Sequence, residues 1–119
     1  MRRGEIWLIN LDPTIGAEIK KTRPAVIVND DAVGILPLKI IVPITEWKDR
    51  YAVAPWMIRV DPDSSNRLDK ASAVDTFQIR SVSHQRFVRR VGAVSDKVIS
   101  EIERGLATVL NIRMDTDLH

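Results

Sequence analysis

The sequence predicts a mainly β protein with added α structure: a small, strongly curved antiparallel barrel with a C-terminal helix packed against it. Short apolar runs rich in β-branched residues recur between residues 4 and 94, and turn residues close them. A long helical pattern occurs only near the C-terminus. Strands therefore do not alternate with helices, as they would in a parallel sheet.

Residues 4–10 are expected to form the first strand, and the Asp12-Pro13 pair ends it. The most apolar strand starts at Pro24, whose missing N–H is tolerated at a first position, and its β-branched residues predict burial on both faces. Further strands are expected over residues 38–45, 54–60, 71–80 and 89–94, with a helical turn at 83–87. Trp7 and Trp56 fall in these strand patterns and are expected in the core.

The predicted helix runs from Asp96 to Asn111, with Ser95 as its N-cap. Gly105 weakens this helix unless another element packs closely there. Residues 114–119 are expected to be frayed. The apolar residues on one stripe of the helix are Val98, Ile99, Ile102, Leu106, Val109 and Leu110.

Length and composition indicate one domain over residues 1–119. Eighteen Lys and Arg residues against sixteen Asp and Glu leave a net charge of +2, so any affinity for nucleic acid must come from local charge. The chain has no cysteine, which excludes disulfides, zinc ribbons and thiol nucleophiles. No signal sequence and no apolar run long enough for a membrane span is found, so a cytoplasmic protein without membrane contact is expected.

Two basic segments could form one electropositive groove, or could be two separate solvated faces. The first is a long loop that carries Glu18, Lys20 and Lys21 and leads into Arg23. The second runs from Thr76 to Val94 without an acid and contains Arg80, Arg86, Arg89 and Arg90. Trp47, in a polar loop, could stack on a base or on a partner.

Arg23 stands where a polar loop meets a strand, and Thr45 ends the apolar strand at 38–45. Each of these two residues has a structural alternative. Arg23 suits bidentate contact with a phosphate, but it could also bridge to a carbonyl or to Glu18. Thr45 could simply satisfy local backbone. The histidines, His84 and His119, have no partner at metal-binding spacing, so a reaction without metal or cofactor is expected.

Taken in order and spacing, several segments resemble the MazF/PemK/Kid toxins of bacterial toxin–antitoxin systems over nearly the whole chain. The matching segments are Arg3-Gly4-Glu5-Ile6-Trp7, Leu11-Asp12-Pro13-Thr14, Gly16 with Glu18, Thr22-Arg23-Pro24-Ala25-Val26, Val42-Pro43-Ile44-Thr45, Gln78-Ile79-Arg80, and Val91-Gly92 followed by the helix.

The resemblance implies an SH3-like barrel, a homodimer, and metal-independent, sequence-specific cleavage of single-stranded RNA to 2′,3′-cyclic phosphate and 5′-hydroxyl ends. It implies that Arg23 and Thr45 are catalytic. The group that removes the 2′-proton stays open: Glu18 is a candidate, and an ordinary loop carboxylate is the alternative for this residue. The expected partners are RNA and a cognate acidic antitoxin. The RNA-binding residues expected are Lys20, Lys21, Trp47, Gln78, Arg80 and Arg86.

Two departures and two alternatives accompany this resemblance. Phe77 stands where the family often has an acid, which removes a carboxylate at that position. Ile19 and Lys20 replace a common glutamine and glycine, so the cleavage sequence is not carried over. A non-catalytic inhibitor like the CcdB gyrase poisons, and a barrel that only binds RNA, are the alternative functions.

Overall fold

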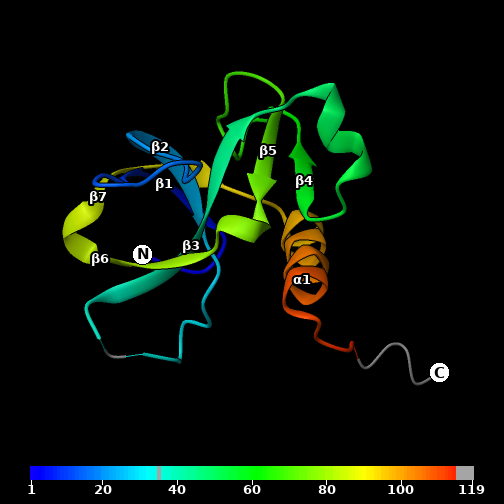
Figure 1. Cartoon of the computed structure of the whole chain (residues 1–119). Coiled ribbons are helices and arrows are strands. Elements are labelled where there is room, and N and C mark those ends of the chain that lie inside the picture. Colours follow the sequence, from blue (N-terminus) through cyan, green and yellow to red (C-terminus); the bar gives the residue numbers. More distant parts are fainter. Residues whose placement is uncertain (35, 115–119) are drawn as a thin grey trace.

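The computed structural model describes residues 1–34 and 36–114, so the predicted fraying at 114–119 falls almost entirely outside the described residues. Seven strands form one antiparallel sheet in the order β4-β5-β3-β2-β1-β7, with β6 also paired to β3 (Figure 1). The strands are β1 (Glu5–Asn10), β2 (Thr22–Ile27), β3 (Leu38–Glu46), β4 (Met57–Val60), β5 (Ser72–Asp75), β6 (Arg80–Ser83) and β7 (Phe87–Ala93).

The helix α1 (Asp96–Leu110) follows β7 and packs beside β4, which confirms the predicted class of a curved β sheet with a C-terminal helix (Figure 1). Three short 3-10 helices complete the described elements: η1 (Asp49–Val53), η2 (Thr76–Gln78) and η3 (His84–Arg86). The last of these confirms the helical turn predicted over residues 83–87. None of the helices in the described ranges is both long and apolar enough to span a bilayer.

The long strand β3 connects the two halves of the sheet. Its middle pairs with β2 on one side, while β6 and then β5 follow one another along its other side. The prediction of one strand over residues 71–80 is therefore wrong. Asp75 ends β5 because its side chain accepts a hydrogen bond from the Phe77 backbone N–H and caps η2, which separates β5 from β6.

Strand β2 is buried on both faces, as predicted, because the sheet has a core on each side. Val26 contributes to a helix-side core, whereas Ala25 and Ile27 contribute to a loop-side core, and all three are 0% exposed. The helix-side core comprises Ile6, Val26, Val42, Ile44, Ile58, Val60, Val74 and Ile102. The loop-side core comprises Ile9, Leu11, Ala25, Ile27, Ile41 and Val82.

The predicted start of this strand at Pro24 is wrong, since β2 begins at Thr22 and Pro24 is paired with Leu8 of β1. The ladder between β2 and β3 begins only at Ala25. The missing N–H of Pro24 therefore lies outside that ladder. The two added residues place Arg23 within the strand, where its backbone is held by β1.

The helix has the predicted cap and the predicted close contact. Ser95 Oγ accepts a hydrogen bond from the Val98 N–H at 3.2 Å. A Cβ on Gly105 would lie 3.0 Å from Thr76 Oγ1 and 3.3 Å from Ile58 Cδ1, so the small residue lets α1 approach η2 and β4. Leu110, which the sequence placed on the apolar stripe, is 53% exposed, because it lies about 80° around the helix from Ile102.

Trp7 and Trp56, both expected in the core, differ in burial. Trp7 is half-buried, packs against the loop-side core and meets Phe87 edge to face, in line with its predicted core position. Trp56 precedes β4 and is 37% exposed, leaning on the exposed ring of Phe77. The core prediction for Trp56 is wrong, because the extended segment forms paired strand only from Met57 onward.

Candidate active site

The register of β2 and β3 brings Arg23 and Thr45 together. The ladder pairs Ala25 with Pro43, and the same antiparallel register continued by two residues places Arg23 opposite Thr45. Both side chains are half-buried and line one groove of about 480 Å³. The two residues singled out in the sequence therefore share a surface that a ligand can reach.

This surface, the cationic groove, has more positive than negative lining residues. Its apolar wall includes Leu8, Pro24 and Val91, and its carboxylates are Glu46 and Asp69. The cations are Arg23, Arg67, Lys70, Arg89 and Arg90. Arg23 from the first basic segment thus lies with Arg89 and Arg90 from the second, which supports the prediction of one shared groove.

Arg67 and Lys70 were missed from the sequence. The stretch before them was interpreted only as a turn, and the available signal was a pair of cations directly after that turn. They reach the groove because the segment that connects β4 to β5 lies against the C-terminal end of β7, where the Ala93 N–H donates a hydrogen bond to the Ser65 carbonyl. No spacing rule within the sequence shows that approach.

The guanidinium of Arg23 is held near the start of β2 by a hydrogen bond to the preceding loop. Its Nε donates a hydrogen bond to the Lys20 backbone carbonyl at 3.1 Å. This contact sets the plane of the side chain and leaves the two Nη groups as the donors that can hold an anion. Lys20 and Lys21 themselves are exposed on the loop that precedes β2.

That loop, residues 11–21, is tied down by three side chains that were expected to bind RNA. Gln78 Oε1 accepts a hydrogen bond from the Ile19 N–H at 2.6 Å. Arg80 Nη1 donates to the Leu11 carbonyl at 3.2 Å, and Arg86 Nη1 donates to the carbonyls of Asn10 and Asp12. In this structure these three side chains position the loop.

Glu18 does not line the cationic groove. Its exposed carboxylate accepts a hydrogen bond from the Ile15 N–H at 2.6 Å. It lies at a second hollow of about 500 Å³ with Phe77, Gln78 and Arg80 among the lining residues. The structure therefore separates this candidate base from the groove that contains Arg23 and Thr45.

A buried carboxylate that sequence analysis missed lies beside this second hollow. Asp75 is 8% exposed and accepts hydrogen bonds from the Phe77 N–H at 3.1 Å and from Gln78 Nε2 at 3.2 Å. Burial raises the pKa of the Asp75 carboxyl, although these hydrogen bonds act in the opposite direction. An aspartate preceding a short turn was the available sequence signal, because such residues cap helices.

Trp47 has contacts of its own within the chain. The Arg59 guanidinium carbon lies 5.2 Å from the centre of the indole ring, and Tyr51 meets the ring edge to face. This cation–π contact covers one face of Trp47. The indole is also half-buried, so a base can reach only the remaining surface.

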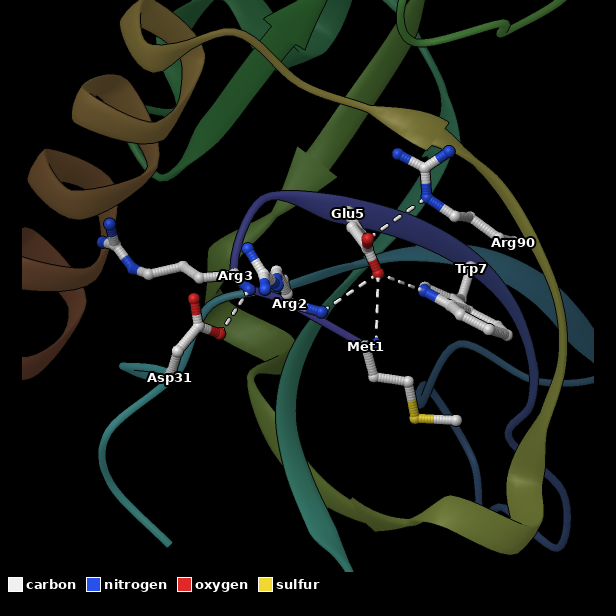
Figure 2. A network of polar contacts seen from close by, with 7 residues as sticks. All are labelled: Met1, Arg2, Arg3, Glu5, Trp7, Asp31 and Arg90. Carbon is white, nitrogen blue, oxygen red and sulfur yellow. Dashed lines mark hydrogen bonds and ion pairs between the residues drawn. The ribbon is translucent and has the colours of Figure 1, made fainter.

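Glu5 organises a network beside the groove (Figure 2). Its carboxylate accepts hydrogen bonds from Trp7 Nε1 at 2.9 Å and from the Arg2 N–H at 3.0 Å, and Arg90 Nε lies 3.2 Å away. Burial raises the pKa of Glu5, but the hydrogen bonds and the charges of the N-terminal amine and Arg90 outweigh it and lower the pKa from 4.5 to about 2. Glu5 thereby holds one of the groove cations.

Replacing Glu5 by Gln is expected to reduce stability at neutral pH by about 1 kcal/mol, a value discounted for solvent screening. The folded-state pKa lies below the unfolded value, so the stabilising contribution is present above about pH 4.5 and is lost as the pH falls toward 2. Urea unfolding of both proteins at several pH values measures this difference. A difference in free energy of unfolding between the two proteins that stays constant from pH 7 to pH 2.5 would contradict the lowered pKa of Glu5.

Within residues 1–34 and 36–114, no group of three or more His, Cys, Asp or Glu side chains is placed to hold a metal ion. The site instead combines an arginine and a hydroxyl with further cations. Together with the curved β fold, it defines a class of small proteins that can bind a polyanion and stabilise charge on a phosphate.

Comparison with known proteins identifies the family. The model of the PemK-like, MazF-like toxins of type II toxin–antitoxin systems matches residues 2–110. The chain belongs to this family. It is 30% identical over 118 residues to Endoribonuclease MazF9 of Mycobacterium tuberculosis, covering 94% of this chain and 98% of the relative.

Solved structures agree on the fold. The crystal structure of MazF from Deinococcus radiodurans superposes with a TM-score of 0.77 at 21% identity, covering 93% of this chain and 96% of the other. A mycobacterial endoribonuclease in complex with its cognate antitoxin superposes with a TM-score of 0.75 at 18% identity, covering 96% and 98% of the two chains.

Proposed function

We propose that this chain is the toxin of a type II toxin–antitoxin system and a metal-independent endoribonuclease that cleaves single-stranded messenger RNA and so inhibits translation and growth. The observation that carries the proposal is the presence of both Arg23 and Thr45 in the cationic groove of a chain belonging to the toxin family. The relative from Mycobacterium tuberculosis is named an endoribonuclease, which supports the reaction class.

The proposed reaction uses the nucleophile that RNA itself supplies. The 2′-oxygen attacks the adjacent phosphorus, the bond from phosphorus to the 5′-oxygen breaks, and the products carry a 2′,3′-cyclic phosphate and a 5′-hydroxyl. The enzyme must align these atoms and stabilise the charge that builds on the phosphate oxygens. Neither task requires a metal.

Arg23 is assigned to charge stabilisation and to proton donation to the departing 5′-oxygen. Arginine remains protonated at neutral pH, so it suits these roles and is a poor general base. Thr45, facing it across the two strands, is assigned a hydrogen bond from its hydroxyl to the phosphate. This hydrogen bond fixes the phosphate while the in-line attack occurs.

The group that removes the 2′-proton was left open, with Glu18 as a candidate and an ordinary loop carboxylate as its alternative, and the contacts of Glu18 make this the weakest of the three roles. Its carboxylate is engaged with Ile15 at the second hollow. Glu18 can act as the base only if the loop that carries it shifts toward the cationic groove. A single-turnover pH profile of Glu18→Gln tests the role, because loss of the catalytic base would remove the acidic limb of the profile.

Removal of the Thr45 hydroxyl is expected to slow cleavage by about 10²-fold, the usual cost of one hydrogen bond to developing charge. Thr45→Val keeps the shape of the side chain, and Thr45→Ser keeps the hydroxyl as a matched control. Single-turnover cleavage of an RNA in EDTA measures both rates. Equal rates for Thr45→Val and the wild-type protein would remove Thr45 from the catalytic assignment.

The proposed partners follow from the same groove. Single-stranded RNA is the substrate, and an acidic, partly disordered antitoxin segment is proposed to cover the cations and compete with RNA. Support comes from the mycobacterial endoribonuclease, which was solved with its cognate antitoxin. A homodimer and a cytoplasmic location complete the proposal.

The alternative functions are separated by chemistry. A gyrase-inhibiting toxin of the CcdB type or a barrel that only binds RNA would use the cationic surface without cutting the phosphodiester. The presence of both Arg23 and Thr45 in the groove favours the ribonuclease.

A further inference from the structure

We propose that residues 61–70, which connect β4 to β5, form a second phosphate-binding subsite for the RNA backbone, with Arg67 and Lys70 as its cations. The inference rests on the proposed ribonuclease function and assigns a part of the cationic groove away from the strand pair that holds Arg23 and Thr45. Both cations line the groove. What distinguishes them from ordinary surface charges is the construction of the segment that carries them.

Asn66 holds the segment in shape from within. It is 1% exposed, and both polar atoms of its side chain are hydrogen-bonded. Its Oδ1 accepts hydrogen bonds from the backbone N–H groups of Asp63 and Leu68, both at 3.0 Å, and its Nδ2 donates to the Asp61 carbonyl at 2.9 Å. A buried side-chain amide that forms hydrogen bonds with the backbone groups around it in this way holds the loop in one conformation.

The segment is also fixed to β7, the strand that carries Arg89 and Arg90. The Ala93 N–H donates to the Ser65 carbonyl at 3.0 Å, and the backbone of residues 65 and 66 lies against Gly92. Leu68 packs against the helix-side core. Contacts on both sides of Arg67 therefore hold it at a set position relative to the β7 arginines.

The backbone of Arg67 is in an unusual conformation. Its φ is +55°, a value that glycine adopts freely and that other residues rarely adopt. The side chain is exposed and lines the groove, so the conformation does not place it in the core. A residue held in such a conformation by its surroundings points to a role for its side chain.

Lys70 is available to a phosphate despite its acidic neighbour. Lys70 Nζ lies 3.4 Å from Glu46 Oε2, but these two side chains are 64% and 59% exposed. An ion pair this exposed contributes little to stability, so a phosphate of the RNA backbone can replace the Glu46 carboxylate as the partner of Lys70. Glu46 and Asp69 are the two carboxylates against the five cations of the groove.

The test measures binding of a 2′-O-methylated single-stranded RNA, which cannot be cleaved, over a range of salt concentrations. Arg67→Gly removes the cation while suiting the positive φ, Lys70→Ala removes the second cation, and Arg67→Lys keeps the charge. Arg104→Ala, an exposed arginine on α1 outside the groove, is the matched control. A Tm of Arg67→Gly at or above the wild-type value establishes that the fold is intact.

Arg67→Gly and Lys70→Ala are each expected to weaken RNA binding about tenfold. Each also lowers the slope of log K against log salt by about 0.7, the value for one lost phosphate contact on a single strand. Arg104→Ala binds RNA like the wild-type protein. Arg67→Lys keeps the wild-type slope.

Wild-type affinity and slope in both Arg67→Gly and Lys70→Ala, with active wild-type enzyme, would overturn this subsite and leave the ribonuclease proposal standing. Weaker binding of an acidic peptide with unchanged RNA binding would also overturn it, because the subsite would then serve a protein partner. Failure of the wild-type protein to bind or cut RNA would overturn the proposed function itself.

Discussion

Arg23→Ala is expected to lower the rate of RNA cleavage by at least about 10³-fold, as is typical when an arginine that stabilises charge on a transferred phosphoryl group is removed. The structure supplies the reason: the guanidinium is anchored through Nε to the Lys20 carbonyl, and Arg23 lines the cationic groove together with Thr45. Its loss removes both a fixed positive charge and the proposed donor to the 5′-oxygen. Single-turnover cleavage of a long RNA in EDTA measures the effect.

Arg23→Lys serves as the matched control for charge. Lysine keeps the positive charge but not the planar fork, so its cleavage rate is expected to lie between those of Arg23→Ala and the wild-type protein. Unchanged far-UV circular dichroism and Tm in both variants separate loss of chemistry from loss of fold. Full activity in a clean Arg23→Ala preparation would contradict the catalytic assignment.

Gly92→Ala is expected to destabilise the protein by about 3 kcal/mol, at the upper end for an added group in a packed site. A Cβ at this position would lie 2.5 Å from the Ser65 carbonyl oxygen and 2.7 Å from that of Asn66. Both are backbone atoms of a segment that Asn66 holds rigid, so they have little freedom to move. Urea unfolding measures the loss.

Gly105→Ala is the control for this prediction. The new methyl would meet the side chains of Thr76 and Ile58 at 3.0 to 3.3 Å, so these need to shift by only a few tenths of an ångström, whereas at Gly92 the new methyl would meet backbone atoms at 2.5 to 2.8 Å. Alanine also gains about 1 kcal/mol of helix propensity over glycine, which offsets the crowding. If Gly92→Ala lowers the free energy of unfolding no more than Gly105→Ala does, the rigid contact between residues 61–70 and β7 is contradicted.

The sequence predicted the elements whose signals are local. Alternating and continuous apolar runs identified β1, β2 and β3, and Ser95 marked the start of α1. The division of residues 71–80 was missed because β-branched and apolar residues continue through it. The division depends on the Asp75 side chain, which turns back to the Phe77 N–H, and a strand pattern does not reveal that choice.

The site was predictable where the family resemblance named residues and less so where contacts join distant segments. Arg23 and Thr45 were named from matching segments, and the β2–β3 register brings them together. The loop contacts of Arg80 and Arg86 span 69 and 74 residues of sequence, so their part in holding the loop could not be read from spacing. The same holds for Arg67, which the fold alone brings to the groove.

The ends produced by the purified protein from a long single-stranded RNA in EDTA test the central claim most directly. Mapping by primer extension, with chemical identification of the termini, is expected to show cuts at a defined sequence that leave a 2′,3′-cyclic phosphate and a 5′-hydroxyl. Arg23→Ala, prepared in the same way, is expected to show none. Intact RNA with the wild-type protein, or equal cutting by both proteins, would contradict the assignment of this groove as a ribonuclease active site.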